Sequence, residues 1–195
     1  MTKTINRAAA IGLVLLAATA CSSTPGTPPA STAPPSSTGP QVPQVANPLN
    51  VGKYEQDPCA ALTQAQATEV FGAVRNRKAP GNVAPACAWN DSDNSSIHLG
   101  FLPGQGGLQT VYKNSIDAGG GYFEPSPAIS DHPAAFSGVH DDRQSGGCQV
   151  FVGVTNEETF SVSSNLRPSS SSYRDPCALV TKVAEAALAT IKAGA

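Results

Sequence analysis

The feature that most limits how this chain can fold is the uneven distribution of residue types along its 195 residues. Every residue from 22 to 40 is Ser, Thr, Pro, Gly or Ala, and residues 41–50 add two prolines and no aromatic residue. Such a stretch buries too little apolar area to offset the entropy lost on ordering it. We therefore expect residues 21–50 to form a disordered linker and residues 51–195 to form a single domain.

The first twenty residues have the pattern of a bacterial export signal. Lys3 and Arg7 give a basic start, and the apolar run over residues 8–18 is shorter than the ~20 residues that span a bilayer. Small residues then precede Cys21, in an arrangement that resembles the lipobox of bacterial lipoproteins. There the cysteine thiol receives a diacylglyceryl group, and cleavage makes that cysteine the new N-terminus. The resemblance implies signal residues 1–20 and a lipoprotein held by acyl chains such as palmitate on the extracytoplasmic face of the cell membrane.

The chain contains five cysteines, and lipid attachment to Cys21 would account for the odd number. The other four lie in the expected domain of an exported chain, where disulfides persist. They form no C-x-x-C pair, so zinc and thioredoxin-type chemistry have no local support. We expect two disulfides, one between matching helix starts and one between two strands: Cys59–Cys177 and Cys87–Cys148. The alternative is the sequential set, Cys59–Cys87 and Cys148–Cys177.

Three segments have the spacing of helices. Residues 57–63 and 175–181 are near copies, and each begins with Asp followed by Pro, the pattern of a helix start. The first predicts a helix that ends at Gly72, and the second opens an amphipathic helix whose apolar stripe reaches Ile191. A third helix fits residues 108–116.

Alternating apolar and polar residues predict strands between these helices. The predicted strands cover residues 87–89, 97–101, 133–138, 149–154 and 160–163. Hairpins with intervening helices indicate an α+β fold. We expect an antiparallel sheet of about four to six strands, with two or three helices packed on one side of it.

These features together resemble one protein family. The lipobox cysteine, the Ser/Thr/Pro linker and four cysteine motifs resemble actinobacterial lipoproteins of the LprB/LprC type, which carry a domain of unknown function. The motifs are Asp57-Pro58-Cys59, Cys87-Ala88-Trp89, Gly147-Cys148-Gln149-Val150 and Asp175-Pro176-Cys177. The resemblance covers residues 57–192, implies an envelope-anchored α+β domain, and carries over no catalytic residue. More remotely, the arrangement resembles the extracellular sensor domains of mycobacterial receptor kinases.

The charge of the chain and its motifs limit the classes of function that it can have. The chain has 12 Lys and Arg against 14 Asp and Glu, without the basic patch of a nucleic-acid-binding protein. It has no G-x-S-x-G elbow, and we expect no catalytic residue, no cofactor and no metal. We expect a membrane-anchored binding or accessory module for an envelope protein or a small ligand. The alternative is an envelope hydrolase that uses His132 or His140 with nearby carboxylates.

Three further segments and one tryptophan could each have a chemical role. For each of them an ordinary structural role is the better interpretation. The acidic segment 91–94 begins like a calcium loop but lacks the later Gly and Glu of that pattern. Glycines in 104–107 precede a helix without the lysine of a P-loop. The basic segment 75–78 is expected to be solvated surface, and Trp89 is expected to pack against a disulfide through its neighbour Cys87.

Overall fold

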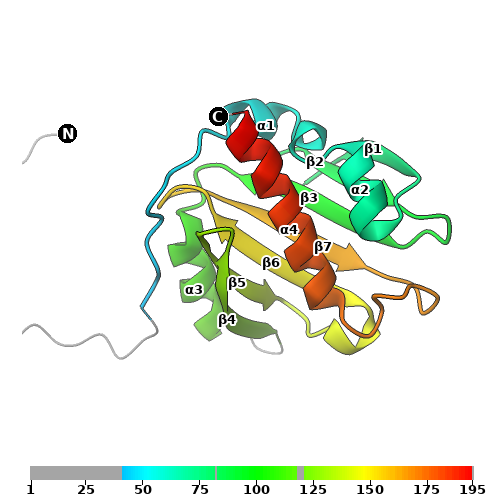
Figure 1. The fold of residues 1–195 in the computed structure, drawn as a ribbon. Coiled ribbons are helices and arrows are strands. Elements are labelled where there is room, and N and C mark those ends of the chain that lie inside the picture. The colour runs from blue at the N-terminus through cyan, green and yellow to red at the C-terminus, as the bar shows by residue number, and fades with distance from the viewer. Residues whose placement is uncertain (1–40, 82, 118–120, 195) are drawn as a thin grey trace, which may run out of the picture. The chain divides into compact units, whose positions relative to one another are not determined.

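The computed structural model describes residues 41–81, 83–117 and 121–194, and within them one sheet of seven antiparallel strands (Figure 1). The strands lie side by side in the order β1-β2-β3-β7-β6-β5-β4. Their bounds are β1 Arg75–Ala79, β2 Ala86–Asn90, β3 Ser96–Leu102, β4 Tyr122–Ile129, β5 His132–Gly138, β6 Gly147–Gly153 and β7 Thr159–Asn165. The expected α+β fold is confirmed, with more strands than predicted.

Four α-helices and two 3₁₀ turns complete the described part of the chain. They are α1 Gly52–Gln56, η1 Pro58–Ala61, α2 Gln64–Phe71, α3 Gly107–Asp117, η2 Arg143–Ser145 and α4 Pro176–Ala193. Helix α4 begins as predicted, because the Asp175 carboxylate accepts a hydrogen bond from the Ala178 N–H. Its apolar stripe ends at the predicted residue, Ile191, which is fully buried.

The first predicted helix is interrupted in the structure. The 3₁₀ turn η1 follows Asp57 and stops before the extended, fully buried Leu62. Helix α2 then begins after Thr63. The Thr63 hydroxyl accepts a hydrogen bond from the Gln66 N–H, and the Gln66 side chain accepts one from the Thr63 N–H. This reciprocal cap is a stronger start than the Asp-Pro pair upstream. The helix ends at the predicted Gly72, whose φ of 75° suits glycine.

The sequence pattern does not predict two of the strands, β1 and β4, and these are the two edge strands of the sheet. In β1 the first four residues are exposed, so no apolar alternation marks this strand. It is the segment predicted to be basic surface. Strand β4 contains Pro125 and Pro127, which an interior strand would not tolerate but an edge strand can accommodate.

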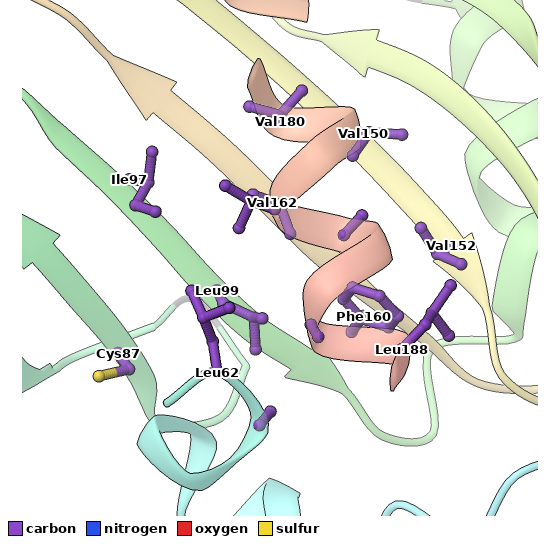
Figure 2. Close-up of a cluster of buried hydrophobic side chains, with 14 of the residues drawn as sticks. Leu62, Cys87, Ile97, Leu99, Val150, Val152, Phe160, Val162, Val180 and Leu188 are labelled. Atoms are coloured by element: carbon purple, nitrogen blue, oxygen red, sulfur yellow. The ribbon is translucent and has the colours of Figure 1, made fainter. Parts of the chain in front are cut away.

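The main core lies between α4 and one face of the sheet. Figure 2 shows Val180 and Leu188 of α4 above side chains from the three central strands β3, β7 and β6. The fully buried strand residues of this core are Cys87, Trp89, Ile97, Leu99, Val150, Val152, Phe160 and Val162. The α4 stripe and the strand alternation therefore meet on the same face, as amphipathic elements require.

Helix α3 packs on the opposite face, so the helices cover both sides of the sheet and not one side. Leu108 and Tyr112 of α3 form a second buried cluster with Ala135 of β5, and Phe151 of β6 packs against it. The neighbouring Ala134 belongs to the main core, because successive residues of a strand point to opposite faces. Helix α3 packs mainly on β4, β5 and β6, and no other helix of the described residues covers the β1, β2, β3 and β7 part of this face.

The last ten residues of the expected linker bind to the domain. We call residues 41–50 the N-terminal arm. Val45 is 8% exposed and its N–H donates to the Asn156 side chain at 2.9 Å, while the Leu49 N–H donates to the Val154 carbonyl. Prolines and polar residues dominate this segment, but its few apolar residues are enough to attach it along the β6–β7 hairpin. The signal segment and Cys21 lie outside the described residues.

The preferred disulfide pairing is wrong, and the sequential alternative is the one present. Cys59 of η1 bonds Cys87 of β2, and Cys148 of β6 bonds Cys177 of α4. Strands β3 and β7 lie between β2 and β6, which separates those strands by about 14 Å, three times the usual strand spacing. A Cys87–Cys148 bond cannot span that distance. Each bridge instead ties a helical start to the strand beneath it.

Candidate ligand-binding groove

Over β2, β3, β7 and β6 this sheet face carries uncharged side chains, most of them small, whereas Arg75 and Arg77 of β1 lie at its edge. Strand register aligns the uncharged side chains in two rows that cross β2, β3, β7 and β6. The rows are Ala88–His98–Ser163–Gln149 and Ala86–Gly100–Ser161–Phe151. Because residues in register across neighbouring strands point to the same face, these side chains form a shallow floor beside α3.

Two adjoining cavities of about 260 and 450 Å³ lie over this floor. They share Leu102, Val139, Gln149 and Phe151, and we call them together the groove. The groove is further lined by Val83, Ala86, His98, Gly100, Ser161 and Ser163 on one side, and by Thr110, Val111, Asn114, Ser137 and Thr159 near α3. Small ligands usually bind in concave sites whose lining is mostly apolar with a few polar groups.

One wall of the groove exists because β5 separates from β6. These strands pair only over Ala134–Phe136, beyond which β5 pairs with β4 alone as far as Gly138. Tyr122 fills the gap, and its hydroxyl accepts a hydrogen bond from the Gln149 N–H at 2.9 Å. Gly138 makes room for that ring, since a Cβ there would lie 2.6 Å from the Tyr122 Cε1 atom. The divergence raises Val139 onto the rim, where it is 76% exposed.

Tyr122 is held in place from both sides. The Arg143 guanidinium lies 4.3 Å from the centre of its ring and also bonds Asp141 and Glu124. Burial raises the pKa of the Tyr122 hydroxyl, so it stays protonated. A smaller cavity of about 170 Å³ adjoins this ring and is lined also by His140 and Asp142.

His98 is the titratable side chain that lines the groove within the described residues. It is half-buried, and its Nε2 lies 3.2 Å from the Ser96 hydroxyl. Burial, and secondly the charge of Arg77 on β1, lower the pKa of His98. The imidazole is therefore neutral at neutral pH, and the described lining carries no formal charge.

Exposed apolar side chains gather at the groove. The large hydrophobic residues that are exposed in the described chain are Val74, Val83 and Val139. Val83 and Val139 line the groove, whereas Val74 lies between α2 and β1. Apolar side chains that gather beside a cavity are more informative than one apolar residue alone.

The two histidines of the alternative prediction, a hydrolase, lie far apart in the structure. His132 opens β5 and is 1% exposed, with its Nδ1 2.9 Å from the Gly153 carbonyl oxygen. His140 follows the other end of β5, about 20 Å away at the usual rise per strand residue. Asp142 lines a cavity with His140, and no carboxylate is shared by the two histidines in the described part of the chain.

The other predicted candidates have structural roles. Asp91 closes the β2–β3 turn, where its carboxylate accepts from the N–H groups of Asp93 and Ser95. Trp89 is fully buried in the main core, and the indole N–H has no hydrogen-bond partner among the described residues. The glycine segment 104–107 leads into α3. The described residues contain no group of three His, Cys, Asp or Glu side chains that could hold a metal, and no helix among them is long and apolar enough to cross a membrane.

The groove residues themselves were not singled out by the sequence. Positions 98, 149, 161 and 163 are the polar members of alternating strands, which sequence alone assigns to solvent. One signal was available: these positions hold His, Gln and Ser rather than the Lys and Glu common on a solvated sheet face.

Buried His132 makes stability depend on pH. Burial is the main cause that lowers its pKa and the charge of Lys192 adds to it, whereas the hydrogen bond to Gly153 and the charge of Asp131 oppose the shift. The folded protein therefore binds this proton less readily than the unfolded chain, and the free energy of unfolding falls as pH decreases below about 6.5.

This pH effect can be measured by urea denaturation between neutral and mildly acidic pH. His132→Asn keeps a donor to the Gly153 carbonyl and removes the titration, so its stability should depend less on pH than that of the unchanged protein. His140→Ala, at an exposed histidine, is the control and should keep the full dependence. Equal pH dependence in His132→Asn and the unchanged protein would contradict the role of His132.

One known protein family matches most of this domain and also part of the chain that precedes it. The model of a family described as "Protein of unknown function (DUF3558)" matches residues 16–190. The chain belongs to this family. No curated protein and no solved structure matches the chain. The DUF3558 match includes Cys21 and all strands of the sheet, and it ends within α4.

Proposed function

We propose that this DUF3558 protein is a lipid-anchored binding module of the cell envelope, related to the LprB/LprC type of lipoprotein, and that it holds its ligand in the groove. The observation that carries the proposal is the uncovered sheet face between α3 and the β1–β2 connection, with cavities above it and exposed valines at its rim. The export signal and Cys21 support the anchor, and the family match includes Cys21.

The walls of the groove are supported in a way that suits binding. Tyr122 and Arg143 hold the diverging end of β5, and Cys148 of the neighbouring strand β6 is bonded to α4. Packing of Phe151 against the α3 cluster holds the helix beside the floor. A site whose walls are fixed before binding loses less conformational entropy when the ligand arrives.

The hydrolase alternative has less support. His132 is buried with one nitrogen bonded to a backbone carbonyl, which leaves it no access to a substrate in the groove. His140 with Asp142 adjoins the smallest of these cavities, so a hydrolase would depend on that pair. The remote likeness to sensor domains of receptor kinases is compatible with ligand binding, and we give it no separate role.

The anchor is tested by Cys21→Ser in the full chain expressed in an actinobacterial host. We expect the unchanged protein to sediment with membranes and to carry the mass of acyl chains at Cys21, whereas Cys21→Ser leaves the membrane fraction. A native mass spectrum in mild detergent reports the acyl mass and any bound small molecule together. Membrane retention of Cys21→Ser with an unmodified mass would contradict the anchor.

A further inference from the structure

We propose that the ligand of the groove is an uncharged amphiphile, an apolar chain joined to a neutral head group that bears hydroxyls. The inference rests on the proposed function and names the chemical class of its ligand. It follows from three properties of the lining: its lack of charge, its apolar strip and its unpartnered polar atoms.

The lack of charge disfavours an ionised ligand. A charged group that enters the groove would lose water without gaining an ionic partner in the described lining. Arg143 near this face is paired with two carboxylates, and Arg75 donates to the Asn94 side chain at 2.6 Å; neither arginine lines the two cavities. Arg77 of β1 lies in register with Ala88 and so on the same face as the floor, but it is outside the residues that line the two cavities.

The apolar strip suits a chain more than a flat ring. Leu102, Phe151 and Val139 belong to both cavities and join them into one apolar path. Small residues Ala86 and Gly100 deepen the floor at one end. The path crosses from β2 to β5, four strand spacings or about 19 Å, a length suited to an extended chain.

The polar atoms of the floor are free to bind hydroxyls. The side chains of Ser161, Ser163 and Gln149 form no hydrogen bond within the described residues, although each lines the larger cavity. Hydroxyl and amide groups donate and accept without charge, as a neutral head group with hydroxyls requires. The floor therefore matches the head group while the strip matches the chain.

The test uses the full chain with Cys21→Ser, which carries no lipid of its own, and calorimetric titration below micelle concentrations. The probes are decyl maltoside, decyl sulfate, decyltrimethylammonium and maltose. We expect decyl maltoside to bind with one-to-one stoichiometry and at least roughly tenfold more tightly than either charged probe, with no binding of maltose. A second variant, Ser161→Phe, fills the floor and should abolish binding.

Matched valine variants locate the site without disturbing the core. Val139→Ser should weaken decyl maltoside binding roughly fivefold, because a rim side chain loses its apolar contact with the chain. Val74→Ser makes the same change at a comparably exposed valine outside the groove and should leave the affinity unchanged. Equal effects of the two variants would contradict the proposed site.

The outcomes separate the two proposals. If a charged probe binds as tightly as decyl maltoside or more tightly, and Ser161→Phe abolishes that binding, the groove is the site and the neutral class is wrong. If no probe binds, or if binding survives Ser161→Phe, then both the inference and the groove as the binding site are overturned. Binding of maltose as tight as that of decyl maltoside would overturn the role of the apolar chain.

Discussion

Replacing Cys177 with serine is expected to lower the free energy of unfolding by about 3.6 kcal/mol, the chain-entropy value for a loop of this length. The bridge to Cys148 closes a loop with a sequence separation of 29, so its loss releases that loop in the unfolded chain. Denaturation in guanidinium, followed by fluorescence of the single tryptophan, measures the change.

The same variant tests which cysteines are paired. In Cys177→Ser the free thiol should map to Cys148, and the Cys59–Cys87 bridge should stay intact. The double variant Cys148→Ser/Cys177→Ser removes that thiol and serves as the control for its reactivity. A free thiol at Cys59 in place of Cys148 would contradict the pairing in the structure.

The second large effect is expected at the centre of the main core. Phe160→Ala should cost about 3–5 kcal/mol, the usual range when a buried aromatic side chain is truncated. Phe160 is fully buried, and its ring centre lies 5.8 Å from that of Phe101. Leu188 of α4 lies close to it in Figure 2, so truncation leaves a cavity between the sheet and the helix.

The neighbouring position supplies a matched control for this measurement. Ser161 belongs to the same strand but faces the groove, so Ser161→Ala should change the free energy of unfolding by at most about 0.5 kcal/mol. Both variants can be compared by the midpoint and slope of urea denaturation. If Phe160→Ala costs no more than Ser161→Ala, the assignment of the two faces of β7 is wrong.

The sequence was most informative where burial of one face requires apolar residues at a regular spacing. Helix α4 and strands β3, β6 and β7 each place apolar residues on one face, and these elements form the main core. The edge strands β1 and β4 bury little, so neither shows an alternation that could be recognised. Local periodicity reports burial, and it is weakest where an element has only one neighbour.

The groove and the disulfides could not be predicted for a different reason. Both depend on strand order, which places β7 between β3 and β6 although the chain reaches β6 first. The two similar Asp-Pro-Cys starts suggested a mutual bond, yet each cysteine bonds the strand under its own helical segment. Likewise, Ser163 neighbours both His98 and Gln149 only after the sheet has assembled.

The N-terminal arm also determines how mechanical tension from a membrane anchor would enter the domain. Between Cys21 and residue 41 the chain spans 20 residues, a contour of at most about 72 Å. A pull along it first reaches Val42, which packs against the α3 cluster, and then Val45 and Leu49, whose hydrogen bonds attach the arm to the β6–β7 hairpin. Because the arm is not paired as a strand, it would detach before any strand and lengthen the tether by about 35 Å. The sheet and its groove would stay folded under a force that already moves the domain farther from the bilayer.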